Sequence, residues 1–180
     1  LGRQVRLAFG GFALDRYRRL IAQVHDENGL WLQGEMVARG MARVRSLPDN
    51  GFPVDDLLLM EAAARAEARG IWADPFYRIR SPDEAEGDID SFQIVEGAVT
   101  DRARVRDRIY LNFGPDWRTD FTVSIETRLL KAFEKAALDP MDLKGRKIRV
   151  RGWIESRNGP FIDATHPEQI EVMPEQPPES

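Results

Sequence analysis

Short runs of alternating apolar and polar residues, separated by glycine and proline turns, fill most of the second half of this 180-residue chain. A period of two is typical of β-strands that are buried on one face. It predicts strands over 92–100, 109–113, 121–125, 147–154 and 169–173, with a short extra strand at Phe161-Ile162. Leu129, Leu130 and Phe133 instead recur at helical spacing between the third and fourth strands. The second half is therefore predicted to be mainly β with one helix.

This order of elements favours one barrel topology. Three strands, a helix and two further strands follow one another in an OB fold, a five-stranded Greek-key barrel that often binds oligonucleotides. Gly114-Pro115-Asp116 and Asn158-Gly159-Pro160 supply turns between the predicted strands. We therefore expect an OB-like domain over residues 92–173.

The first half of the chain predicts strands followed by helices. Strands over 4–9 and 20–24 lead to an Asn28-Gly29 hairpin turn and a short return strand over 30–32. Helical spacing follows over 36–44, with Gly40 near its end as a left-handed cap. The clearest helix runs over 55–69, with Asp55 as its N-cap and Gly70 just past its end.

Composition separates the two regions. Residues 81–90 hold five acidic residues, a proline and a glycine, which is typical of a solvated linker. We expect a first domain over 1–77, an acidic linker over 78–91, the OB-like domain over 92–173 and a disordered tail over 174–180.

Composition also excludes several kinds of site. The formal net charge is −4, so any attraction to nucleic acid has to come from a local basic site. The absence of cysteine excludes disulfides, Cys-ligated zinc and thiol catalysis. The two histidines, His25 and His166, are far apart in sequence and do not suggest a histidine-rich metal site. No apolar run approaches the roughly 20 residues that span a membrane.

Three stretches of the first half carry a resemblance to a known family. They are Asp15-Arg16-Tyr17-Arg18-Arg19, Arg39-Gly40-Met41-Ala42-Arg43-Val44 and the run from Glu61 to Trp72. In this order and spacing they resemble the staphylococcal-nuclease-like (thermonuclease) family, over about residues 3–76. One position departs from the family pattern, because Arg18 stands where the family usually has glycine.

The resemblance implies a partial OB-type nuclease barrel whose first strands are absent from this chain. It also implies a metal-dependent nuclease of DNA or RNA in the intact protein. The family's calcium ligands and general base precede the part of the barrel that residues 4–9 match, so none maps here, and we expect this chain alone to be inactive. Arg19 matches the family's second catalytic arginine, and Tyr17 matches a family residue that lies close to the bound nucleotide. A bidentate guanidinium stabilises negative charge on phosphoryl oxygens without losing its proton.

Basic and aromatic residues on the predicted strands of the second half offer another nucleic-acid site. Arginines beside exposed rings suit a single-strand groove, because phosphates bind the cations and bases stack on the rings. One row contains Arg106, Arg108, Tyr110 and Asn112, which Arg102 and Arg104 join only if the hairpin turn keeps the register; a second contains Arg149, Arg151 and Trp153. The alternative is a solvated sheet face.

Three classes of function stay open at this point. The first is a metal-dependent nuclease in which the OB-like domain helps to hold the substrate. The second is a non-catalytic module, built from two OB-type barrels, that binds nucleic acid or protein. The third is an interaction protein in which both barrels bind other proteins. The sequence does not decide between DNA and RNA.

Overall fold

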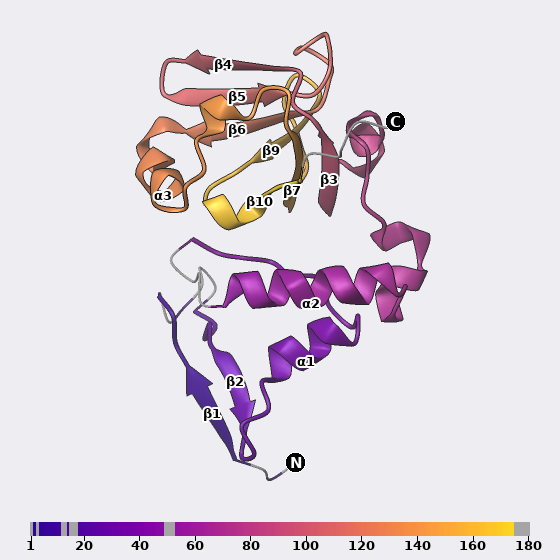
Figure 1. Cartoon of the computed structure of the whole chain (residues 1–180), viewed down its shortest axis with the longest axis vertical. Coiled ribbons are helices and arrows are strands. Elements are labelled where there is room, and N and C mark those ends of the chain that lie inside the picture. Colours follow the sequence, from indigo (N-terminus) through magenta and orange to yellow (C-terminus); the bar gives the residue numbers. More distant parts are fainter. Residues whose placement is uncertain (1, 3, 12–13, 15–17, 49–52, 175–180) are drawn as a thin grey trace. The chain divides into compact units, whose positions relative to one another are not determined.

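The chain forms two compact units, Leu1–Arg78 (unit 1) and Ile79–Ser180 (unit 2). The computed structural model in Figure 1 describes residues 2, 4–11, 14, 18–48 and 53–174. Both units contain strands and helices, and the fold is mainly β with helices, as predicted. Among the described residues, no helix has the length and apolar character that crossing a membrane requires.

Unit 1 is a β-hairpin followed by two helices. Strands β1 (Val5–Ala8) and β2 (Gln23–Asp26) pair antiparallel, and α1 (Leu32–Ala38) and α2 (Val54–Ala66) follow. Two short 3-10 turns, η1 (Gly70–Ala73) and η2 (Pro75–Tyr77), end the unit. Its small core consists of the buried side chains of Val37, Val44, Val54 and Leu57.

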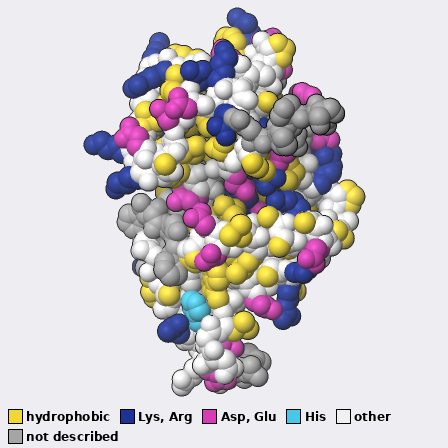
Figure 2. Space-filling model, viewed as in Figure 1, with side chains coloured by type: hydrophobic (Ala, Val, Ile, Leu, Met, Phe, Trp, Pro, Cys, Tyr) yellow, Lys and Arg dark blue, Asp and Glu magenta, His cyan; other side chains and the backbone are white. Residues whose placement is uncertain are grey.

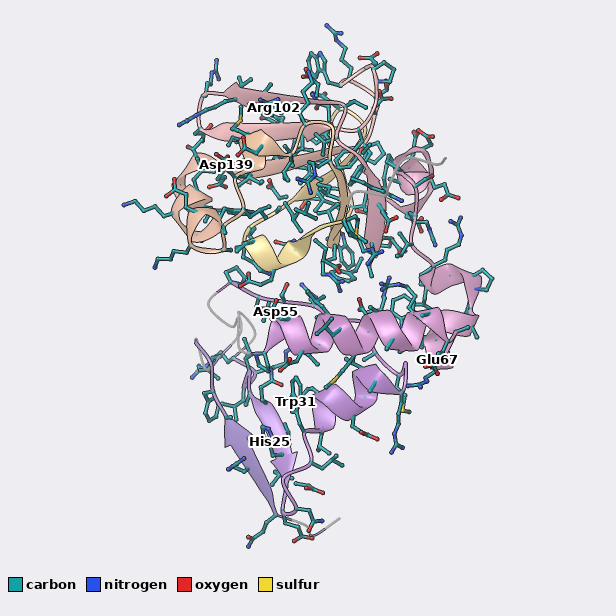
Figure 3. All side chains as sticks on the ribbon, in the orientation of Figure 1. His25, Trp31, Asp55, Glu67, Arg102 and Asp139 are labelled. Atoms are coloured by element: carbon teal, nitrogen blue, oxygen red, sulfur yellow. The ribbon has the colours of Figure 1, made fainter. Side chains whose placement is uncertain are left out.

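Several predicted boundaries of unit 1 differ from the observed ones, since the strand predicted over 20–24 is β2 (Gln23–Asp26) and the helix predicted over 36–44 is α1 (Leu32–Ala38). The return strand over 30–32 is reduced to one bridge between His25 and Trp31, because α1 already begins at Leu32 (Figure 3). Asp55 is not the N-cap of α2, since Pro53 holds that position and Asp55 lies in the first turn. Its negative charge still stabilises the helix there, where the helix dipole is positive.

Both helices end in the same hydrogen-bonded motif. After α1, Gly40 N–H donates to Val37 O and Met41 N–H donates to Met36 O, the pair of bonds that defines a Schellman motif. Gly40 takes φ 68°, so its predicted role as a left-handed cap is confirmed. After α2, Ala68 takes the equivalent position with φ 50°.

Unit 2 contains eight strands and one α-helix among its described residues. The helix α3 (Leu130–Lys135) lies between the third and fourth predicted strands, as expected. The strands are β3 (Phe92–Ala98), β4 (Asp101–Val105), β5 (Arg108–Asn112), β6 (Thr122–Glu126), β7 (Lys147–Trp153), β8 (Glu155–Ser156), β9 (Pro160–Asp163) and β10 (Ile170–Val172).

The ladders of unit 2 follow the OB order through two bent segments. One sheet has the order β10-β7-β3 and the other β4-β5-β6-β9-β8. β3 runs directly into β4, and β7 into β8, so each bend passes the chain from one sheet to the other. The ladders therefore form two sheets and not one closed barrel. A continuous apolar core lies between them, including Val95, Ile109, Leu111 and Phe133.

The fifth OB strand is not the one that the alternation predicted. β9, the short segment at 160–163, pairs parallel with β6 and takes that place. The segment predicted over 169–173 forms β10, which pairs with β7 at the edge of the other sheet. Alternation identifies both as strands but does not say which neighbour each one pairs with.

The acidic segment after residue 78 is structured. Residues Pro82–Asp88 form the 3-10 helix η3, which begins with a capping box between Ser81 and Glu84. The Arg80 N–H donates to Ile94 O, and the Arg80 guanidinium pairs with Asp88 at 2.6 Å. Ala85 is fully buried in the core of unit 2. This segment is therefore part of unit 2, whereas the sequence predicted a solvated linker.

Candidate nucleic-acid interface

The predicted catalytic arginine lies in the segment that joins the two strands of unit 1. Arg19 and Arg18 are both exposed, next to the isolated bridge between Leu14 and Leu20. Tyr17 lies outside the described residues. Arg18 takes φ 63°, the left-handed conformation that glycine adopts easily. The backbone at this departure from the family pattern is thus one that glycine also favours.

On β5 the predicted basic row is only partly formed. Arg106 lies in the two-residue turn between β4 and β5, with φ 54°, so it does not belong to the strand as its spacing suggested. Arg108, Tyr110 and Asn112 do share one face of β5. Arg102 and Arg104 lie on the opposite face, because they pair with Leu111 and Ile109 across this turn.

Arg108 is held by acidic neighbours. Its Nη1 donates to Asp163 Oδ1 at 2.5 Å and to Ser124 Oγ at 2.6 Å, and its Nη2 lies 3.3 Å from Glu126 Oε1. The hydrogen bond to Asp163 raises the pKa of Arg108 above its ordinary value. The charge of this arginine is therefore largely balanced within the sheet.

The second predicted row, on β7, is also neutralised. Arg149 Nη2 lies 2.5 Å from Glu96 Oε2 on β3, and Arg151 Nη2 lies 2.6 Å from Glu171 Oε1 on β10. Burial alone would raise the pKa of Glu96, but hydrogen bonds from Lys147 and Arg149 outweigh it and hold the pKa below its usual value. Because these guanidiniums have carboxylate partners, the arrangement gives their predicted role in binding nucleic acid no support.

An aromatic pocket lies on the face of unit 2 that carries Tyr110. It is open to solvent and holds about 430 Å³. Three rings line it, from three different elements: Tyr110 from β5, Trp117 from the loop between β5 and β6, and Phe161 from β9. Asn112, Arg157 and Asn158 are among the polar residues of its wall. We call this site the aromatic pocket.

The two loops at the mouth of the pocket are packed together through their backbones. A Cβ on Gly159 would lie 2.4 Å from Thr119 O, so only glycine permits this approach. Within the first loop, the Asp120 carboxylate accepts a hydrogen bond from Asp116 N–H at 2.6 Å. In the second, Arg157 N–H donates to Gly159 O at 2.8 Å. These contacts fix the positions from which Trp117 and Arg157 reach the pocket.

Cations at the mouth are stacked on rings. The Arg157 guanidinium lies 4.6 Å from the centroid of Phe161, and the Arg118 guanidinium lies 4.6 Å from that of Trp117. On the molecular face drawn in Figure 2, Lys and Arg side chains are interspersed with Asp and Glu. Sequence reasoning identified Tyr110 but missed Trp117, Phe161 and Arg157. The sequence did contain one sign of the site, because these residues lie next to the predicted turns Gly114-Pro115-Asp116 and Asn158-Gly159-Pro160.

A hairpin with two capped helices, followed by an OB-like unit with a ring-lined pocket, defines a mainly β protein of two small units. Residues 2–74 match the family described as staphylococcal nuclease homologue. Unit 1 is therefore a staphylococcal-nuclease-like domain, as its motifs predicted. No curated protein matches the chain.

The family resemblance implies calcium, and the described residues do not fit it. Among them, no three His, Asp or Glu side chains lie close enough together to hold a metal ion. Ca²⁺ takes six or more oxygen ligands, several of them carboxylates. A calcium site would therefore need ligands other than the described residues.

Proposed function

We propose that the protein is a nuclease of DNA or RNA, in which unit 1 contributes to phosphodiester hydrolysis and unit 2 holds the substrate. The observation that carries this proposal is the family match over residues 2–74, the region that contains Arg19. The intact protein would require a divalent metal, as the resemblance implies. Its substrate would be a polynucleotide rather than a small phosphate ester, because unit 2 adds a second binding surface.

Arg19 is the described residue with the chemistry that such a reaction needs. Hydrolysis of a phosphodiester builds negative charge on the equatorial oxygens of the phosphoryl group. A guanidinium stays protonated and offers a planar pair of donors that match two of these oxygens. Arg19 is exposed, so a substrate can reach it.

A non-catalytic nucleic-acid-binding module is the second candidate. The observation that favours it is the absence, among residues 2, 4–11, 14, 18–48 and 53–174, of an acidic cluster able to hold a metal ion. In this case Arg19 would bind phosphate without contributing to turnover.

Cleavage of a fluorogenic oligonucleotide by the protein at its full natural length separates the two candidates. We expect cleavage that a chelator abolishes. Arg19→Ala should lower turnover by roughly 10²–10⁵-fold, the range for donors of this kind. Arg19→Lys should recover little of this, because an ammonium lacks the planar fork.

Arg18→Ala is the matched control for Arg19→Ala. Arg18 is adjacent, exposed and equally charged, but the family motif gives it no catalytic place. Equal losses in the two variants would mean general electrostatic attraction and would remove the assignment of Arg19. A full-length protein without metal-dependent cleavage would leave the binding module as the function.

A further inference from the structure

We propose that the aromatic pocket of unit 2 binds one unpaired nucleobase, so that the protein selects single-stranded over duplex nucleic acid. This inference rests on the proposed function for its choice of nucleic acid as the ligand. The pocket has the size of a small-ligand site, which is commonly about 300–1,000 Å³. Its volume of about 430 Å³ accommodates a nucleobase with part of its sugar.

Trp117 is the ring of the pocket that is most open to a base. Phe161 is 2% exposed and belongs to the buried residues of unit 2, and Tyr110 is half-buried, so both rings line the pocket from the sheet. Trp117 is 52% exposed and lies in a loop that the hydrogen bond between Asp116 and Asp120 holds in place. A large ring held in solvent by an ordered loop offers a stacking surface that every base can use, because each base has a π-face.

Polar groups beside the rings suit the edge of a base. The amides of Asn112 and Asn158 line the pocket with donors and acceptors, and the Thr122 hydroxyl, which also lines it, donates to Asn112 Oδ1 at 3.4 Å. Asn158 takes φ 54°, a left-handed conformation that asparagine tolerates better than most residues. A base can thus stack on a ring and satisfy its hydrogen-bonding edge in the same pocket.

Two arginines lie beside rings of the pocket and supply positive charge for the phosphates that adjoin a bound base. Arg157 and Arg118 are both stacked on rings of the pocket. Arg157 lies 3.5 Å from Glu155 in an exposed pair, and such pairs contribute little, so its guanidinium can turn to a phosphate. A neutral oligosaccharide could use the rings and the amides but has no charge for these arginines.

Duplex nucleic acid fits this arrangement poorly. Its bases are stacked and paired, and a base must leave the helix to enter a pocket, at a cost of a few kcal/mol. Tight binding to a duplex comes mainly from many phosphate contacts. Among the described residues that line the pocket, Arg157 is the one cation and Asp101 adds a negative charge, while Arg118, beside Trp117, lies 3.8 Å from Asp116.

Fluorescence anisotropy with the 180-residue chain, in the presence of a chelator, tests the inference without cleavage. The probes are labelled DNA and RNA strands of about eight nucleotides, within the site size of one OB domain, and a blunt duplex of the same sequence. We expect both single strands to bind more tightly than the duplex. Trp117→Ala should weaken binding about 5–150-fold, the equivalent of losing one stacked base. Trp117→Phe should restore part of it.

Trp153→Ala tests the alternative row predicted on β7, since Trp153 is 51% exposed in the same unit but does not line the pocket. It should leave the affinity unchanged. Equal effects of the two alanine variants, equal binding of duplex and single strands, or displacement of the strand by a neutral oligosaccharide would each overturn the inference. If the chain binds no strand while the full-length protein cleaves its substrate, the inference fails and the nuclease stands. If the full-length protein does not cleave but binding depends on Trp117, the nuclease proposal fails and the inference stands.

Discussion

Gly40→Ala tests a backbone contact in unit 1 between the segment that follows α1 and the segment that follows α2. The glycine that ends α1 lies against the chain that leaves α2. A Cβ on Gly40 would be 2.2 Å from Arg69 O, and a Cβ on Gly70 would be 2.2 Å from Gly40 O. Between these contacts, Ile71 N–H donates to Gly40 O at 2.8 Å. The two backbones therefore touch where neither position has room for a side chain.

The expected cost of Gly40→Ala has two parts. Placing alanine at φ 68° costs about 1 kcal/mol, since the left-handed region is unfavourable for residues with a Cβ. The clash is with backbone, so it can be relieved only if the segments separate and the Ile71 hydrogen bond is lost. That adds about 1–2 kcal/mol. The total of about 2–3 kcal/mol is a large fraction of the stability of a small domain.

Gly29→Ala is the control that isolates the steric part. Gly29 lies in the same unit with φ 84°, but no atom lies within 4 Å of a Cβ placed there. It should cost only the conformational part, about 1 kcal/mol. Urea unfolding followed by far-ultraviolet circular dichroism is suitable, because the two longest α-helices of the described residues, α1 and α2, both belong to unit 1. Equal urea midpoints of unfolding for Gly40→Ala and Gly29→Ala would refute the contact between the segments that follow α1 and α2.

Two further changes test local features of the fold. Ala68→Gly should stabilise unit 1 by about 1 kcal/mol in urea unfolding, because φ 50° at this cap suits glycine, whereas Ala63→Gly inside α2 should destabilise it by a similar amount. Burial lowers the pKa of His166 to about 4, so the unfolded chain binds this proton first as the pH falls. Stability should therefore decrease between pH 6.5 and about 4, by on the order of 3 kcal/mol at most, and thermal unfolding of His166→Asn should not show this decrease.

Local chemistry was enough to predict several features of the fold. The cap at Gly40 follows from backbone conformation, which depends on the residue itself and its immediate neighbours, whereas the left-handed cap of α2 is Ala68 and not the glycine that follows, Gly70. The OB order follows from alternation and turn residues, and α3 from helical spacing. The family motifs were recognised for the same reason, because their glycines and apolar residues are required by close backbone contacts such as that between Gly40 and Gly70.

Features that depend on pairing between distant segments could not be predicted. Carboxylate charge suggested a solvated segment after residue 78, but Ala85 is buried, and Asp88 pairs with Arg80. The register of β7 decides that Arg149 faces Glu96 across the sheet. The alternating pattern of β7 cannot predict this pairing. It determines which face of the sheet a residue lies on, but not which residue of the neighbouring strand lies opposite.

The ion pairs of the strand arginines bear on how unit 2 would recognise nucleic acid. The predicted rows placed the affinity in strand cations, yet Arg108, Arg149 and Arg151 all have carboxylate partners within the sheets. What remains is the exposed ring of Trp117, together with Arg157 and Arg118, whose ion pairs with Glu155 at 3.5 Å and Asp116 at 3.8 Å are longer and exposed. On the proposed base-stacking mode, affinity should therefore depend weakly on salt, with a log–log slope near 1.4 for two phosphate contacts, at about 0.7 each. A steeper slope would mean that cations outside the pocket carry the binding, and recognition would then belong to charge and not to stacking.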